Sequence, residues 1–237
     1  MKPYQSILID ECGEPLVPLS LTEFAVVTPH PYVALGAPYG DLSPYWVRES
    51  IAVALHQAQQ NLQAKHPGWQ LQIFDAYRPL AVQQFMVDYT AQELAQQQGL
   101  DLAQASEVEK QALMAQVYQF WALPSANPKT PPPHSTGAAI DLTLLNNTGE
   151  PIDMGSPIDE VSTRSHPEHF QTQTDEHSQQ IHQHRCLLRQ VMSAAGFQQH
   201  PNEWWHFSLG DQMWAWLKVK STGQAAIARY GCMDPED

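Results

Sequence analysis

Positive charge is scarce in this chain of 237 residues. It contains 12 lysines and arginines against 25 aspartates and glutamates, which gives a formal net charge of −13 at pH 7. Binding to nucleic acid needs concentrated lysine and arginine to neutralise the phosphates. The composition therefore argues against a nucleic-acid partner.

Long apolar runs are missing as well. Hydrophobic residues make up 43% of the chain, yet no apolar run approaches the roughly 18 residues that a membrane-spanning helix needs. The N-terminal stretch reaches Asp10 after a short apolar segment, which is too early for the apolar region of a signal peptide. We therefore expect no membrane partner and a cytoplasmic location.

Cysteine is rare too, with three widely separated residues, Cys12, Cys186 and Cys232. They show neither the C-x-x-C spacing of a metal site nor the even number of a disulfide framework. We expect them to be inert thiols rather than nucleophiles.

Proline, in contrast, is abundant in the first forty residues. Residues 1–42 are therefore predicted to form extended segments and turns. No internal repeat or linker divides the rest of the chain. We predict one α+β domain over residues 1–237, with an irregular segment at 1–42 and a core at 43–237.

Apolar periodicity and breaker residues divide this core into helices and strands. Ser43-Pro44 is typical of a helix start, and His66-Pro67-Gly68 is typical of its end. Strands are predicted over 69–74, 137–145 and 204–209, and further helices over about 80–98, 105–122 and 175–195 and around Met213 to Leu217. Together these elements predict a central, mostly antiparallel β-sheet flanked by helices.

The strand predicted over 137–145 has two contrasting faces, because side chains on a strand alternate with a period of two. Ile140, Leu142 and Leu144 form an apolar face that suits a core. The opposite face carries Asp141 and Thr143 among small residues, and it suits the lining of a pocket.

Two short motifs place metal-binding side chains at distant points of the chain. His134 precedes Asp141 by seven positions, and Glu203 precedes His206 by three. A catalytic zinc needs three ligands drawn from His, Asp, Glu or Cys, together with a nearby carboxylate that acts as a base. His134, Asp141 and His206 can supply the ligands on one face of the sheet, and Glu203 can be the base.

Each motif alone also has an ordinary structural interpretation. His134 could be a surface or core residue, and Glu203 could be an exposed loop acid. The combination of both motifs favours the metal site. Because residues three apart on a regular strand point to opposite faces, Glu203 must precede the strand of His206, or a bulge must redirect it.

Other polar residues could complete such a site. Arg78 follows the strand over 69–74, and its permanent charge could stabilise the anionic species of peptide hydrolysis; a structural salt bridge is the alternative. Asp153 and Asp159 occupy a loop and could bind a cation such as a peptide amine, although solvated loop acids are common. A histidine-rich segment is interpreted as a solvated polar face: His166, His169, His177, His182 and His184.

At these positions the chain resembles the D-alanyl-D-alanine dipeptidases, zinc peptidases related to the D-alanyl-D-alanine carboxypeptidases. The family pattern S-x-H-x-x-G-x-A-x-D matches His134, Gly137, Ala139 and Asp141, and E-x-x-H matches Glu203 and His206. Asp75 to Pro79 is similar to the segment with the family's transition-state arginine, and Met154 to Asp159 is similar to its M-G-[ST]-x-x-D loop. The likeness runs from about residue 45 to the end.

The resemblance implies one Zn²⁺ per chain, bound by His134, Asp141 and His206. It further implies that Glu203 is the general base, that Arg78 stabilises the oxyanion, and that Asp159 contacts the substrate amine. The chain departs from the family at Pro132, where the pattern has serine, and at Ile158, where an aromatic residue is usual.

We therefore expect zinc-dependent hydrolysis of D-alanyl-D-alanine, or a similar D,D-dipeptide, in cell-wall peptide metabolism. Two alternatives remain open at this stage. One is a D,D-carboxypeptidase acting on longer peptidoglycan stem peptides, and the other is a non-catalytic binding protein on a zinc scaffold. The expected partner is a small D,D-dipeptide, and no oligomeric state is predicted.

Overall fold

The structure is a computed structural model that describes residues 2–233, and its centre is a five-stranded sheet. The strands lie in the order β2 (Ala25–Val26), β4 (Gln70–Asp75), β5 (Ala139–Leu145), β7 (His206–Ser208) and β6 (Gln198–Gln199). β2 pairs parallel to β4, and the other pairs are antiparallel. The prediction of an α+β fold with a mostly antiparallel sheet is confirmed.

The register of the three central strands places polar residues side by side. Asp141 on β5 is paired with Asp75 on β4 and with His206 on β7. The apolar residues that alternate with Asp141, namely Ile140, Leu142 and Leu144, are fully buried. The period of two therefore separated the core face of β5 from its polar face correctly.

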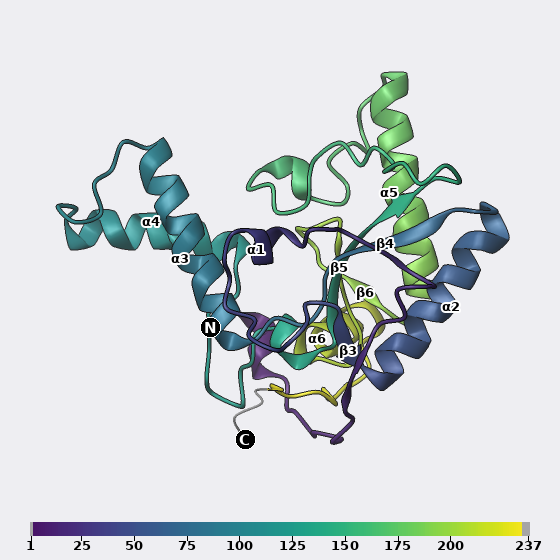
Figure 1. Cartoon of the computed structure of the whole chain (residues 1–237), viewed down its shortest axis with the longest axis horizontal. Helices are drawn as coiled ribbons and strands as arrows, with labels where there is room; N and C mark the ends of the chain where they lie inside the picture. Colours follow the sequence, from purple (N-terminus) through teal and green to yellow (C-terminus); the bar gives the residue numbers. More distant parts are fainter. Residues whose placement is uncertain (1, 234–237) are drawn as a thin grey trace.

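Helices α2 (Glu49–Lys65) and α5 (Glu176–Ala194) lie beside each other on the apolar side of the sheet (Figure 1). Their apolar residues recur at helical spacing, such as Ile51, Leu55 and Leu62 on α2, and join Leu188 and strand residues in one core. This packing leaves the opposite side of β5 free to carry a site.

A second helix pair extends away from the sheet as an arm (Figure 1). It consists of α3 (Leu80–Gln97) and α4 (Glu107–Phe120), which pack together through a separate apolar cluster. Ser106 caps α4 by accepting a hydrogen bond from the backbone N–H of Glu109, whose side chain bonds back to Ser106. Both helices agree with the predicted ranges to within about two residues.

The remaining elements are short, apart from α6. They are η1 (Pro3–Ser6), β1 (Leu16–Pro18), α1 (Pro31–Ala34), β3 (Trp46–Arg48), η2 (His134–Thr136), η3 (Thr163–Ser165) and α6 (Gln212–Thr222). β1 and β3 form a separate antiparallel pair. None of the helices within residues 2–233 combines the length and apolarity needed to cross a membrane.

The expected start of the first core helix is wrong. Ser43-Pro44 does not open a helix, because the carbonyl oxygen of Pro44 accepts hydrogen bonds from the backbone N–H groups of Ala76 and Tyr77. The chain continues as β3, and α2 begins only at Glu49. The strand expected over 204–209 is also shorter, since β7 covers only His206–Ser208. Pairing with distant segments overrides the local signal in both places.

Candidate metal centre and active site

Three side chains from separate segments converge on the polar side of the sheet. His134 Nε2 lies 3.2 Å from Asp141 Oδ2 and 3.2 Å from His206 Nδ1, and His206 Nδ1 lies 3.1 Å from Asp141 Oδ1. All three residues are buried. Within residues 2–233 this is the only group of at least three His, Cys, Asp or Glu whose ligand atoms all lie within 4.8 Å of one another, so the histidine-rich segment forms no second cluster.

Strand register and a tight turn bring these residues together. Asp141 and His206 face each other across the β5–β7 pair. His134 begins η2, which ends at Gly137 with φ of 69° before the chain enters β5. A Cβ atom at Gly137 would lie 2.3 Å from Leu16 Cδ2, so both the conformation and the space require glycine.

Hydrogen bonds behind the cluster determine which imidazole atoms face its centre. His134 Nδ1 donates to the carbonyl oxygen of Ala76 at 2.8 Å, so Nε2 carries the free lone pair of the neutral ring. His206 Nε2 lies 3.4 Å from Ser208 Oγ, which donates to Asp211 Oδ2 at 2.9 Å. Outer partners of this kind orient imidazoles that bind metals.

The centre of the cluster suits a cation. Within residues 2–233, Asp141 Oδ1 is buried without a hydrogen bond, although His206 Nδ1 is 3.1 Å away. Burial alone would raise the pKa of Asp141, but His134 and His206 outweigh it and lower the pKa, so the carboxylate is ionised. An anionic oxygen beside two imidazole nitrogens is a ligand set that Zn²⁺ accepts in catalytic sites. The residues present therefore fit a zinc ion.

Glu203 lies at the edge of this cluster. Its Oε2 is 3.7 Å from His206 Nδ1, and its Oε1 is 3.7 Å from His200 Nδ1. It belongs to the loop between β6 and β7, three residues before β7 begins, so the requirement that it precede the strand is met. Burial raises the pKa of Glu203 to about 7, which is a suitable value for a general base near neutral pH.

Arg78 follows β4 and is held rigidly beside the cluster. Its Nη2 and Nε donate to Asp75 Oδ2 at 2.7 and 3.0 Å, and its Nη1 donates to Gln83 Oε1 at 3.0 Å. The same Nη2 lies 3.6 Å from Asp141 Oδ2. Burial opposes ionisation of Asp75, but the Arg78 guanidinium together with His30 and His134 outweighs it and lowers the pKa of that carboxyl. Arg78 therefore forms a structural salt bridge and also lies beside the cluster.

Asp159 reaches the same site from the loop after β5. Its Oδ2 accepts a hydrogen bond of 2.6 Å from the hydroxyl of Tyr32 on α1. Its backbone has φ of 65°, a left-handed conformation that aspartate tolerates better than most residues. Burial and the charge of Asp141 raise the pKa of Asp159 to about 6. Asp153, in contrast, is an exposed loop acid.

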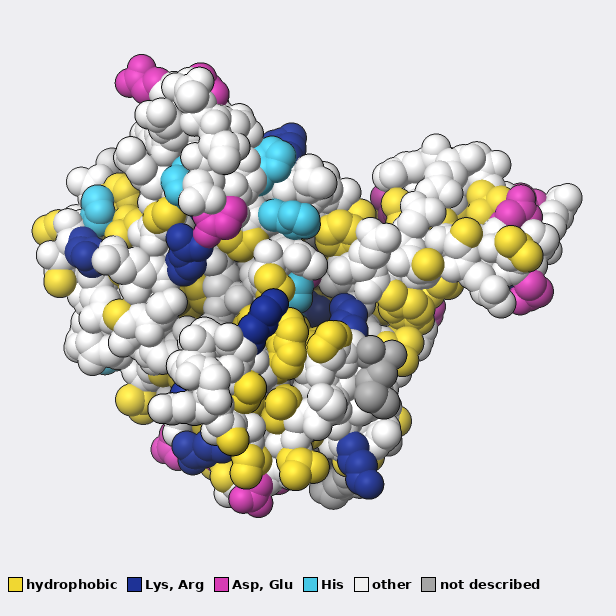
Figure 2. Space-filling model, turned by 180° about the vertical axis from the view of Figure 1, so that it is seen from behind, with side chains coloured by type: hydrophobic (Ala, Val, Ile, Leu, Met, Phe, Trp, Pro, Cys, Tyr) yellow, Lys and Arg dark blue, Asp and Glu magenta, His cyan; other side chains and the backbone are white. Residues whose placement is uncertain are grey.

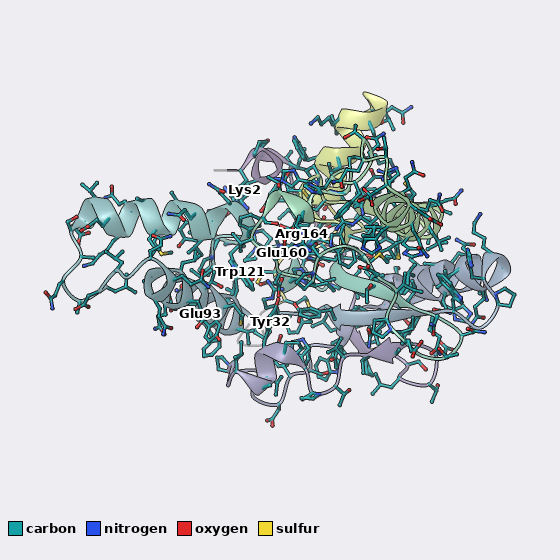
Figure 3. All side chains as sticks on the ribbon, turned by 90° about the horizontal axis from the view of Figure 1, so that it is seen from above. Lys2, Tyr32, Glu93, Trp121, Glu160 and Arg164 are labelled. Atoms are coloured by element: carbon teal, nitrogen blue, oxygen red, sulfur yellow. The ribbon has the colours of Figure 1, made fainter. Side chains whose placement is uncertain are left out.

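The three clustered side chains, together with Glu203, Arg78 and Asp159, border one small pocket, with a volume of about 50 Å³, where the helical arm meets the sheet. Figure 2 shows lysine or arginine and histidine side chains close together at the base of the arm. In Figure 3, Trp121 lies between Lys2 and Tyr32. The pocket therefore combines the metal cluster with residues from the N-terminus and from the end of α4.

Comparison with known proteins identifies the family. A family model described as D-ala-D-ala dipeptidase (Peptidase_M15) matches residues 26–222. The chain belongs to this family. It is 47% identical to a D-alanyl-D-alanine dipeptidase of Synechocystis sp. over 98% of this chain and 96% of the relative.

Other similarities are more distant. A D-alanyl-D-alanine dipeptidase of Enterococcus faecalis is 29% identical over 69% of this chain and 73% of its own length. A solved structure, VanYB in complex with D-Alanine-D-Alanine, aligns with 78% of this chain and 83% of its own, with a TM-score of 0.45 and 15% identity. A match at that level adds nothing to the family assignment.

All six residues that the sequence singled out for the site of this D-ala-D-ala dipeptidase family member border the pocket: Arg78, His134, Asp141, Asp159, Glu203 and His206. The sequence analysis missed Lys2, Tyr4, Trp121 and His200, which line the pocket, and Tyr32, which is hydrogen-bonded to Asp159. Tyr32 follows Pro29-His30-Pro31, and Lys2 belongs to no recognisable motif near the N-terminus. No local spacing connects either residue with the distant motifs, so only the folded chain reveals them.

Proposed function

We propose that this protein hydrolyses D-alanyl-D-alanine, or a close D,D-dipeptide, to free amino acids in cell-wall peptide metabolism. The observation that carries the proposal is the buried cluster of His134, Asp141 and His206 with Glu203 at its edge. The 47% identity to a protein named D-alanyl-D-alanine dipeptidase supports the choice of substrate.

In this proposal His134, Asp141 and His206 hold one zinc ion. Zinc bound there would polarise the scissile carbonyl and lower the pKa of water. The protein's own part is to hold the three ligand side chains in place before the metal arrives. The hydrogen bonds from His134 to Ala76 and from Ser208 to Asp211 do this.

Glu203 is the general base and then the general acid. Its carboxylate takes a proton from the attacking water as the new C–O bond forms. The protonated carboxyl then gives that proton to the amine nitrogen as the C–N bond breaks. A pKa near 7, caused by burial, lets the same group perform both transfers near neutral pH.

Arg78 stabilises the negative charge that develops on the carbonyl oxygen. Its bonds to Asp75 and Gln83 fix the guanidinium plane before substrate binds. The faces of Tyr32 and Trp121 also lie against it, with their ring centroids 5.1 and 4.9 Å from Cζ. A fixed charge of this kind costs little reorganisation during the reaction.

Asp159 binds the free ammonium of the dipeptide, with its carboxylate oriented by Tyr32. A longer stem peptide has an amide nitrogen at that point and carries no charge there. A partly buried carboxylate beside the reaction centre therefore favours a dipeptide over the stem peptide that a D,D-carboxypeptidase would use.

The test is a substrate panel on the purified protein supplied with zinc. We expect release of D-alanine from D-Ala-D-Ala, little cleavage of L-Ala-L-Ala, and little cleavage of a stem pentapeptide ending in D-Ala-D-Ala. Preference for the pentapeptide would replace the proposal with the carboxypeptidase. Stoichiometric zinc without cleavage of any peptide would favour the non-catalytic binding protein.

A further inference from the structure

We propose that Lys2, assisted by Tyr4, binds the terminal carboxylate of the dipeptide and so makes the free carboxylate part of the specificity. This inference rests on the proposed function. It concerns the end of the pocket away from Asp159, to which the reaction described above assigns no role. Both residues come from η1 and its first flanking position, and both line the pocket.

The N-terminal segment is fixed in place by several contacts. Gln212 on α6 donates from Nε2 to the carbonyl oxygens of Ile7 and Lys129 at 2.6 and 2.9 Å. The backbone N–H of Lys2 donates to Gln5 Oε1 at 2.8 Å. η1 also packs directly against α6. Lys2 is therefore presented to the pocket by an anchored turn.

The ammonium of Lys2 has little to bind within residues 2–233. Its one hydrogen bond goes to the carbonyl oxygen of Trp121 and is long, at 3.4 Å, and no carboxylate lies within ion-pair distance. Arg78, the other Lys or Arg of the pocket, has donors committed to Asp75, Gln83 and Tyr32. Lys2 is thus the positively charged residue of the pocket whose N–H donors are available to a ligand.

Tyr4 supplies a second donor beside Lys2. The residue is buried, yet its hydroxyl has no hydrogen-bond partner within the described chain. Burial and the carboxylates of Asp211 and Glu203 raise the pKa of this hydroxyl, so it keeps its proton and can donate it. The lining of the pocket also includes four side chains without a hydrogen-bond donor, Phe120, Ala122, Pro133 and Met213.

In this inference, the charges of Lys2 and Asp159 orient a zwitterionic dipeptide in the pocket. The charge of Lys2 lowers the pKa of Glu203 and the charge of Asp159 raises it, so both charged groups lie near Glu203. Figure 3 shows Lys2 and Tyr32, the partner of Asp159, on opposite sides of Trp121. The ammonium of the dipeptide would lie at Asp159, its carboxylate at Lys2, and the scissile amide beside Glu203.

If Asp159 binds the ammonium and Lys2 binds the carboxylate, the substrate must carry both charged ends at the spacing of a dipeptide. A dipeptide amide keeps the ammonium and the scissile bond but loses the negative charge that Lys2 binds. A charge-assisted hydrogen bond contributes enough to change affinity by about 10- to 100-fold. We therefore expect kcat/KM for D-Ala-D-Ala to exceed that for D-alanyl-D-alaninamide by about this factor.

The experiment compares both substrates in the wild type and in Lys2→Met, with a purification tag at the C-terminus. Lys2→Met should raise KM for D-Ala-D-Ala by about 10- to 100-fold, leave kcat nearly unchanged, and leave the amide reaction unaffected. Lys2→Arg should recover most of the affinity. Lys65→Met is the matched control, because it removes a lysine charge from the exposed end of α2.

The outcomes separate the inference from the proposed function. Cleavage of neither substrate by the wild type overturns the proposed function and the inference with it. An active wild type with equal losses for acid and amide in Lys2→Met overturns the inference alone, since Lys2 would then act on Glu203 or on the fold. Unchanged KM in Lys2→Met overturns it as well. Zinc content and the thermal midpoint of each variant show that the protein is folded.

Discussion

The pocket has two sides that are built in different ways. The sheet side consists of His134, Asp141 and His206 on or next to the central strands, with Arg78 after β4 and its partner Asp75 on β4. The rim consists of Lys2, Tyr4, Trp121 and Asp159, together with Tyr32 on α1, which is hydrogen-bonded to Asp159. These residues come from separate segments at η1, α1, the end of α4 and a loop. The two sides differ most in how firmly their polar groups are connected.

On the sheet side, each charged group is held by several others. Asp75 alone contacts Arg78, His30 and Tyr39, at 2.7, 3.2 and 3.1 Å. On the rim, the side chain of Asp159 has one hydrogen bond to the described part of the chain, to Tyr32, and the ammonium of Lys2 has one long hydrogen bond there. In the proposed function, the firmly connected sheet side performs the chemistry, and the more weakly connected segments of the rim select the substrate.

Removing the metal should abolish the activity that depends on the sheet side of the pocket. We expect a chelator to lower kcat/KM by at least about 10⁴-fold, which exceeds the usual contribution of one side chain, and added Zn²⁺ to restore it. His206→Ala should lose activity to the same extent without restoration by zinc. The check combines metal analysis with turnover of D-Ala-D-Ala. Full activity in the metal-depleted protein would contradict the assignment of the cluster.

Replacing the base should separate chemistry from metal binding. Glu203→Gln keeps the shape of the side chain but cannot accept the proton, so we expect kcat to fall by about 10²- to 10⁴-fold. Zinc should stay bound with unchanged stoichiometry, because Glu203 is not one of the three clustered ligands. Turnover near that of the wild type would remove Glu203 from the mechanism.

The sequence reveals the two sides of the pocket to very different degrees. His134 with Asp141, and Glu203 with His206, are close in sequence because a turn and a strand, or a loop and a strand, present each pair. Such spacing is visible in the amino-acid sequence alone. Lys2 and Tyr32 meet the site only through tertiary packing, and 127 residues separate Tyr32 from its partner Asp159.

The same difference explains what succeeded and failed in the prediction of the fold. Helices α3, α4 and α5 were located well because each carries its own apolar periodicity and breaker residues. The start of α2 was misplaced because β3 exists only through its pairing with β1 and through the contacts of Arg48. The backbone N–H of Arg48 donates to Gly137, and its side chain reaches Thr136. Local signals cannot encode such distant partners.

The rim should respond to substitution in KM rather than in kcat. Asp159→Asn removes the charge that binds the substrate ammonium, so we expect KM for D-Ala-D-Ala to rise by about 10- to 100-fold with a smaller change in kcat. Steady-state kinetics with constant zinc content make the measurement. A loss confined to kcat would place Asp159 with the sheet side.

The acidity of Asp159 provides a further test of this role. Because its pKa is raised to about 6, the carboxylate is ionised at pH 7 and becomes neutral as the pH falls through that value. KM in the wild type should therefore increase about fivefold between pH 6 and pH 5. In Asp159→Asn, KM should be high and nearly constant over the same range. A wild-type KM that does not change with pH would contradict ammonium binding at Asp159.

Among the substitutions, the smallest effect should come from Tyr32→Phe, which removes only the hydroxyl. The aromatic ring still packs on Arg78 and Trp121, so we expect KM to rise about three- to tenfold through loss of one hydrogen bond. That bond stabilises the ionised form of Asp159 and lowers its pKa. Without it the pKa rises further, so the increase of KM on acidification should begin at a higher pH than in the wild type. A higher KM with an unshifted pH profile would mean that Tyr32 shapes the pocket without acting on Asp159.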